Sequence, residues 1–119
     1  MTLTQLARPV LSAALVTSVS ADDMGTVVTL RGEADVFTLP LVVDVLAGAI
    51  ADHDGAITVD LADTDFIDVG NARTLARAWQ FLDDHGRTLT LRSPSRAAAR
   101  VLGLLGLSPL VERDRATTP

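Results

Sequence analysis

The stretch ITVDLADTDFIDVGNARTL, at residues 57–75, joins the pattern of a buried strand to that of an amphipathic helix. Residues 57–61 alternate apolar and polar side chains, which is typical of a strand. From Ala72 onward the apolar side chains recur every three or four residues, as on one face of a helix. Segment 66–71 is therefore predicted to be a strand-to-helix turn. Because a helix begins with unpaired backbone N–H groups and a positive dipole end, such a turn suits an anion, a phosphorylation switch or a partner protein.

The rest of the chain repeats these two patterns. The sequence predicts strands at 13–20, 26–32, 57–61 and 88–91. It also predicts a helix between Thr38 and the turn at Asp54–Gly55, a helix from Gly70 to Asp84, and a helix that starts at Ser93–Pro94 and ends at Gly106. In the last helix, we expect Ser93 to be the N-cap and Pro94 to take the first helical position.

Strands that alternate with helices indicate βαβ units with right-handed crossovers. The strands from residue 26 onward should therefore run parallel. The strand at 13–20 is followed by a tight turn at 22–25, so we expect it to pair antiparallel with the next one. The sequence thus predicts an α/β fold with a mixed sheet of four to five strands and helices mainly packed on one face.

Composition argues against several function classes. The net charge of −5 disfavours nucleic-acid binding, which depends on neutralising phosphates. The chain has no cysteine, which excludes disulfides and thiolate metal sites. It also has no lysine, so neither a Schiff-base lysine nor a phosphate-loop lysine can occur.

No apolar run reaches the ~20 residues that a membrane-spanning helix needs. The stretch 9–19 has about the length of a signal peptide, but only Arg8 precedes it as a positive charge and hydroxyl residues interrupt it. We therefore expect a cytoplasmic protein without direct membrane contact. Its predicted organisation is an N-terminal tail at 1–12, one domain at 13–112 and a C-terminal tail at 113–119.

Four segments resemble the STAS domains, the family of the anti-sigma factor antagonists (anti-anti-sigma factors). Gly32–Asp35, which reads GEAD, resembles the family's G-E-x-D signature. Val59–Leu61 followed by Phe66–Asp68 resembles its V-D-L…F-I-D segment. Ser93–Ser95 and Val101–Leu107 resemble its last helix, which ends in a leucine-rich stretch. The order of the four segments matches that of the family.

The resemblance implies a role in partner switching. The family binds an anti-sigma factor, usually a serine kinase-like ATPase, and thereby releases a sigma factor for transcription. The kinase reverses this by phosphorylating a serine at the start of a helix. In this chain Gly70 occupies the serine's position, between Val69 and Asn71, so we expect no control by phosphorylation at the usual site. The nearest hydroxyls belong to Thr64 and Thr74.

The sequence therefore predicts a non-enzymatic binding module without cofactor or metal, and a weak homodimer stays open. We expect the partner surface to combine the loop after the second strand with the start of the second helix. Its predicted residues are Glu33, Asp35, Asp68, Val69, Gly70, Asn71, Arg73 and Thr74.

Two other functions stay open from the sequence. The first is a STAS-type accessory subunit of a membrane (lipid) transport ATPase. The second is a receiver-like phosphotransfer protein built on Asp35, Asp60, Asp63, Asp65 and Asp68, which the missing lysine disfavours. A metal site from His53, Asp54 and His85 is less well supported than capping of helix ends by these histidines.

Overall fold

The computed structural model describes residues 14–112. The tails predicted at 1–12 and 113–119 lie outside these residues. The elements, in chain order, are β1 (Leu15–Asp22), β2 (Gly25–Ala34), α2 (Leu39–Asp52), β3 (Ile57–Asp60), β4 (Thr64–Ile67), α3 (Val69–Asp84), β5 (Leu89–Arg92), α4 (Arg96–Leu104), the 3-10 helix η1 (Ser108–Leu110) and β6 (Val111–Glu112).

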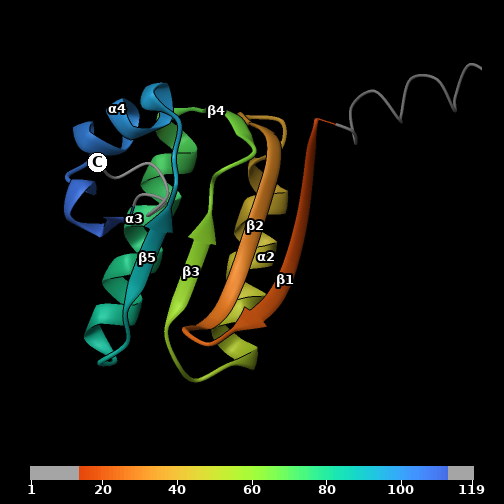
Figure 1. The fold of residues 1–119 in the computed structure, drawn as a ribbon. Coiled ribbons are helices and arrows are strands. Elements are labelled where there is room, and N and C mark those ends of the chain that lie inside the picture. Colours follow the sequence, from red (N-terminus) through yellow and green to blue (C-terminus); the bar gives the residue numbers. More distant parts are fainter. Residues whose placement is uncertain (1–13, 113–119) are drawn as a thin grey trace, which may run out of the picture.

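The strands form one mixed sheet in the order β1-β2-β3-β5-β6, with β4 paired to β2 off this path. β1 and β2 pair antiparallel, whereas β2–β3, β3–β5, β2–β4 and β5–β6 pair parallel. The predicted α/β fold with a mixed sheet is therefore confirmed (Figure 1). The sheet has six strands because β4 and the two-residue β6 join those that the sequence predicts.

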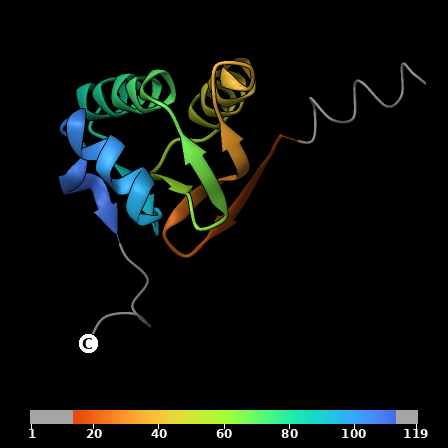
Figure 2. The same cartoon turned by 90° about the horizontal axis from the view of Figure 1, so that it is seen from above.

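α2 and α3 lie side by side on one face of the sheet (Figure 2). α4 packs against α3 and β4 at one end of the sheet, near the start of α3 (Figure 1). The core fills the space between the sheet and these helices. Its fully buried side chains include Leu30, Ile57, Val59, Leu61, Leu75, Leu82, Leu91 and Leu102. Burying such a side chain stabilises the fold by about 1.5–3 kcal/mol, which explains why the apolar patterns predict these elements well.

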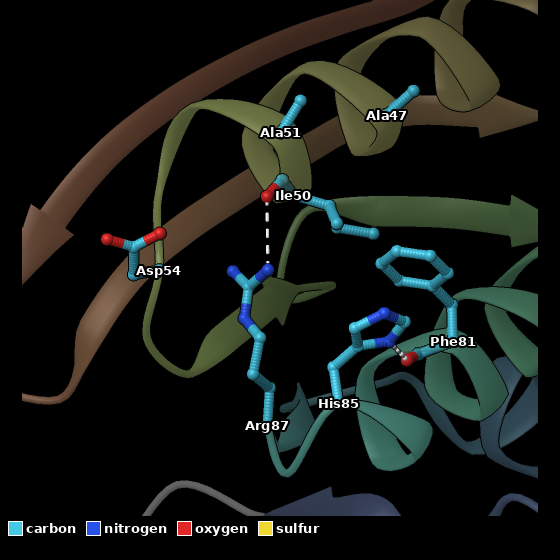
Figure 3. A pocket seen from close by; sticks show the side chains of 7 residues that line it. All are labelled: Ala47, Ile50, Ala51, Asp54, Phe81, His85 and Arg87. Atoms are coloured by element: carbon cyan, nitrogen blue, oxygen red, sulfur yellow. Dashed lines mark hydrogen bonds between the residues drawn. The ribbon is translucent and has the colours of Figure 1, made fainter.

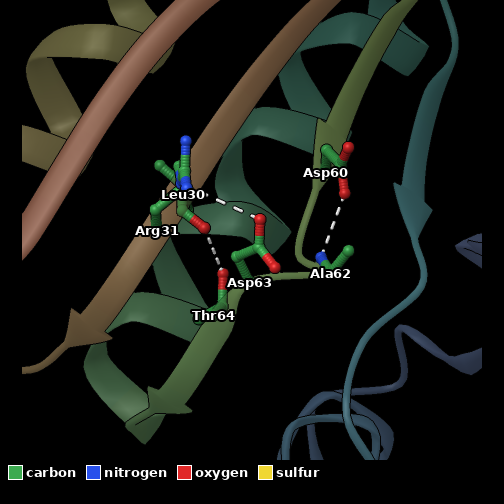
Figure 4. A network of polar contacts seen from close by, with 6 residues as sticks. All are labelled: Leu30, Arg31, Asp60, Ala62, Asp63 and Thr64. Carbon is green, nitrogen blue, oxygen red and sulfur yellow. Dashed lines mark hydrogen bonds and ion pairs between the residues drawn. The ribbon is translucent and has the colours of Figure 1, made fainter.

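A bend between β3 and β4 brings the later part of the chain to the end of β2 (Figure 4). The Thr64 hydroxyl donates to the Leu30 carbonyl at 2.6 Å, and the Asp60 carboxylate accepts from the Ala62 backbone N–H at 3.0 Å. Arg31 lies 3.8 Å from Asp63 in an exposed ion pair. These contacts fix the turn at 61–63, so that β4 extends the line of β3 beside the last residues of β2.

Gly32 allows this arrangement. The register between β2 and β4 shifts between Gly32 and Glu33, and Gly32 has a φ of +115°. A Cβ atom at this position would collide with the Ala14 carbonyl oxygen. Only glycine therefore fits, which gives a physical reason for the first residue of the GEAD segment.

The predicted start of the last helix is wrong. Ser95 is the N-cap of α4, and its hydroxyl accepts from the Ala98 backbone N–H at 3.0 Å. Ser93 has a φ of +54°, and its backbone N–H donates to the Glu112 carbonyl at 2.7 Å. This bond holds Ser93 at the end of β5, beside β6, and Pro94 precedes the cap instead of following it.

Candidate partner-binding surface

Helix α3 begins at a capped turn beside the end of β2. Asp68 is the N-cap, and its Oδ1 accepts from the Asn71 backbone N–H at 2.8 Å. The Asp68 backbone N–H donates to the Ala34 carbonyl at 3.0 Å. A cap of this kind contributes about 1 kcal/mol. The predicted turn between strand and helix is therefore where the sequence places it, and the helix begins at Val69.

Asn71 ties the helix start to the loop that follows β2. Its Nδ2 donates to Asp68 Oδ1 at 2.8 Å and to the Asp35 carbonyl at 3.1 Å. Exchanging the amide oxygen and nitrogen would set oxygen against two acceptors, so the orientation of the amide is fixed. Asn71 is only 1% exposed, and its Oδ1 has no hydrogen-bond partner. The prediction of Asn71 as a contact residue therefore needs correction, because its side chain positions the surface from beneath.

The loop between β2 and α2 is closed by reciprocal hydrogen bonds. Asp35 Oδ1 accepts from the backbone N–H groups of Phe37 at 2.9 Å and Thr38 at 3.1 Å. The Thr38 hydroxyl accepts from the Asp35 backbone N–H at 2.9 Å and donates to the Glu33 carbonyl at 2.8 Å. Thr38 occupies the N-cap position of α2 without a capping bond from its side chain to the helix. Its hydroxyl instead holds the loop in one shape.

The threonine hydroxyls near the start of α3 already donate hydrogen bonds to backbone carbonyls. Thr64 is 3% exposed and its Oγ1 donates to the Leu30 carbonyl. Thr74 is half-buried and its Oγ1 donates to the Gly70 carbonyl at 3.2 Å. At Gly70, an added Cβ would lie 3.6 Å from Asp68 Oδ1, which is an ordinary van der Waals contact. There is therefore room for a Cβ atom at residue 70, and steric crowding does not require glycine there.

The remaining predicted residues differ in exposure. Glu33, Val69 and Arg73 are exposed, whereas Asp35 and Asp68 are half-buried. One carboxylate oxygen of each aspartate accepts hydrogen bonds from nearby backbone N–H groups. The structure brings both segments together at one end of the molecule, where α2 and α3 begin (Figure 1). This end holds the candidate partner-binding surface.

Sequence reasoning named Val69 but missed the other exposed apolar side chains of this surface. Val36 and Phe37 are 65% and 81% exposed in the loop after β2. Phe66 in β4 is 50% exposed, while its neighbour Ile67 is 2% exposed. The sequence did contain a signal for this apolar surface, namely the adjacent apolar residues Val36 and Phe37 directly after the GEAD segment.

A concave region lies at the opposite end of the molecule, between the last turns of α2 and α3 (Figure 3). Its volume is about 680 Å³, and its lining residues are Ala47, Ile50, Ala51, Asp54, Phe81, His85 and Arg87. The Arg87 guanidinium donates to the carbonyls of Ile50, His53 and Gly55 and so closes the end of α2. The His85 ring stacks on Phe81 with centroids 4.3 Å apart. Both polar side chains therefore have local structural roles.

Within residues 14–112, no group of three or more histidine or acidic side chains lies close enough to hold a metal ion. Neither the five acids of a receiver-type site nor the set His53, Asp54 and His85 forms such a group. Among the described helices, none has the length and apolar character that crossing a membrane requires.

Comparisons with known proteins agree with this geometry. Residues 17–112 match the family model described as "Mlab, STAS domain". No curated protein sequence matches the chain.

Several solved structures share the fold. An anti-sigma factor antagonist from Mycobacterium paratuberculosis is 24% identical, with a TM-score of 0.74 over 85% of this chain and 86% of that one. The anti-sigma factor antagonist SpoIIAA in its unphosphorylated form is 18% identical, with a TM-score of 0.72 over 83% of this chain and 88% of that one. A putative anti-sigma factor antagonist from Thermotoga maritima is 21% identical, with a TM-score of 0.67 over 82% and 84% of the two chains.

Proposed function

The chain belongs to the STAS domain family, and from that premise we propose that it is a non-enzymatic antagonist that binds an anti-sigma factor. The proposed partner is a serine kinase-like ATPase, and its capture frees a sigma factor for transcription. The proposal places the protein in the cytoplasm, with residues 13–112 as the binding domain and with neither nucleic acid nor membrane as a direct ligand. The tails at 1–12 and 113–119 are not needed for it.

One observation carries this proposal: the hydrogen bond from Asn71 Nδ2 to the Asp35 carbonyl, which joins two surface segments into one rigid unit. The backbone hydrogen bond from the Asp68 N–H to the Ala34 carbonyl joins the same two segments at their base. A surface that is held in shape before binding loses less conformational entropy when a partner arrives. The exposed residues Glu33, Val69 and Arg73 would contact the partner directly, and the exposed edge of Thr74 would extend the surface along α3.

We further propose that phosphorylation at the usual family position does not control the binding. Gly70 has no hydroxyl, and the hydroxyls of Thr64 and Thr74 are both hydrogen-bonded to backbone carbonyls. A phosphate would add about −1.5 to −2 charges at the helix start. Without it, binding would be governed by the amounts of the two proteins.

A charge placed at Gly70 tests the proposed interface. We expect Gly70→Glu to weaken binding to the anti-sigma factor at least tenfold, because a carboxylate would stand where the family carries phosphate and beside the Asp68 carboxylate. The partner would be identified by pull-down with mass spectrometry, and affinities measured by calorimetric titration. Gly55→Asp is the matched control, because Gly55 lies in an open turn at the opposite end of the molecule.

Two results would contradict the proposal. One is unchanged affinity of the Gly70→Glu variant in a pair that binds with wild-type protein. The other is recovery of a membrane transport ATPase, and no anti-sigma factor, as the partner that responds to this variant. The second result would support the accessory-subunit function instead.

A further inference from the structure

Phe37 is the most exposed large apolar side chain of the described residues, at 81%. Val36 beside it is 65% exposed. Holding two apolar side chains in water is unfavourable, since burying a phenylalanine side chain is worth about 1.5–3 kcal/mol. Exposed apolar side chains that cluster in this way mark protein contacts more often than scattered ones do.

The backbone around Phe37 is fixed. Its N–H donates to Asp35 Oδ1, and the Thr38 hydroxyl bridges the Asp35 backbone N–H to the Glu33 carbonyl. The ring therefore projects from a closed turn and not from a loose loop. An aromatic side chain on a rigid turn pays little conformational entropy on binding, which is a property of binding hot spots.

Further apolar side chains lie at the same end of the molecule. Phe66 is 50% exposed and stands opposite Glu33 in the β2–β4 ladder. Val69 is 43% exposed in the first turn of α3, which Asn71 joins to the Phe37 loop. We call the set Val36, Phe37, Phe66 and Val69 the apolar patch.

Acidic side chains accompany the apolar patch. Glu33 and Asp65 are exposed, and within residues 14–112 their carboxylates make no hydrogen bond or ion pair. Asp35 and Asp68 are half-buried at the base of the same two segments. Arg73, one turn after Val69 in α3, is an exposed basic side chain at the same end, so the surround is mainly but not entirely acidic. An apolar patch with a mainly acidic surround is complementary to an apolar pocket with a basic rim.

We propose that Phe37 is the principal anchor of the interface and that it inserts into an apolar pocket, rimmed by arginine or lysine side chains, on the anti-sigma factor. This inference rests on the proposed function and adds the chemistry of the partner's site. Phe66 and Val69 exclude water around the ring, and the carboxylates of Glu33 and Asp65 meet the basic rim. The anchor gives slow dissociation, and the carboxylates speed association.

The test uses the full-length chain against the purified serine kinase-like anti-sigma factors encoded in the source genome. We expect Phe37→Ala to weaken binding about 30-fold or more, mainly through faster dissociation. Phe81→Ala is the matched control, because Phe81 is a phenylalanine that is 47% exposed but lies at the far end of α3. It should leave the affinity within about twofold.

A second variant tests the basic rim. Glu33→Gln with Asp65→Asn should slow association and flatten the dependence of affinity on salt, because rim charges act mainly through steering. Unchanged salt dependence would mean that the pocket has no basic rim and would overturn that part of the proposal.

The outcomes separate the two claims. If wild-type protein binds and Phe37→Ala binds equally well, the anchor is wrong while the proposed function stands. If no anti-sigma factor binds wild-type protein, both fail. A loss of thermal stability in Phe37→Ala larger than in Phe81→Ala would show that the ring packs on its own chain. A wild-type dimer that Phe37→Ala dissociates in sedimentation would identify a second copy as the occupant. Either of these last two results would overturn the proposal.

Discussion

Gly70 stands where the resemblance to the anti-sigma factor antagonists would place the phosphoacceptor serine. Its Cβ position is open, with Asp68 Oδ1 at 3.6 Å, and its φ lies outside the left-handed region. Neither the backbone nor the space around it therefore requires glycine at this position. This supports a difference in regulation more than a difference in fold.

The variant Gly70→Ser should fold as the wild type does and should create a phosphoacceptor. We expect incubation with the partner kinase and ATP to add about 80 Da to this variant and nothing to wild-type protein or to Gly70→Ala, measured by intact mass. Phosphorylated Gly70→Ser should also lose affinity for the kinase. A mass gain that maps to residues 64–74 of wild-type protein would contradict control by abundance.

Asn71 shows what a sequence can and cannot reveal about one residue. Its place in the turn could be predicted from the strand and helix patterns around it. Its burial could not, because it depends on the Asp35 carbonyl, 36 residues earlier in the chain. The same separation explains why the sequence could suggest which segments lie near each other but could not show which of their side chains are exposed.

At the scale of elements, local patterns predict what local forces determine. The parallel order of β2, β3 and β5 follows from the apolar alternation and the intervening helices. β4 could not be predicted in the same way, because it exists through the pairing of Glu33 with Phe66 and the register shift at Gly32. Since β4 presents Phe66, the sequence could not place this side chain on the surface.

The start of α4 gives a test at this scale. The sequence offers two serines as caps, and the structure selects Ser95 because Ser93 is held by the Glu112 carbonyl. We expect Ser95→Ala to lower the free energy of unfolding by about 1 kcal/mol. Ser93→Gly should be neutral or stabilising, since a φ of +54° strains any residue with a Cβ. Urea unfolding would measure the free energy of unfolding of both variants. If Ser93→Gly were the more destabilised of the two, Ser93 and not Ser95 would be the N-cap.

At the scale of the whole molecule, the two ends of the helices serve different purposes. α2 and α3 begin at the same end of the molecule (Figure 1). That end carries exposed apolar and acidic side chains. At the other end Arg87 donates to three carbonyls and His85 stacks on Phe81. Under the proposed function the first end contacts the partner protein, whereas the contacts at the second end close the fold.

An ion pair joins Asp22, the last residue of β1, to Arg92, the last residue of β5. Arg92 in β5 donates to Asp22 Oδ2 at 3.1 Å, across a separation of 70 residues. The Met24 backbone N–H donates to the other carboxylate oxygen at 2.8 Å. No local pattern predicts such a pair. The pair links the β1–β2 turn to β5, which is separated from β2 by β3 in the sheet. Its loss should therefore lower the stability of the entire sheet.

The pair makes stability depend on pH in a definite direction. The Met24 backbone hydrogen bond, followed by the hydrogen bond from Arg92, lowers the pKa of Asp22 below its ordinary value of 3.8. A lowered pKa in the folded state means that Asp22 stabilises the fold at pH values above 3.8. This contribution is lost as the pH falls through the lowered pKa.

We therefore expect Asp22→Asn to have a lower Tm than wild-type protein at pH 7 and an equal Tm in strong acid. Asp23→Asn is the control, because the Asp23 side chain makes no hydrogen bond within residues 14–112, and its Tm should follow wild-type protein throughout. Thermal unfolding scans across this range, at low and high salt, would measure the effect. A Tm difference between Asp22→Asn and wild-type protein that stays constant into strong acid would show that the tether does not act through the ionised carboxylate.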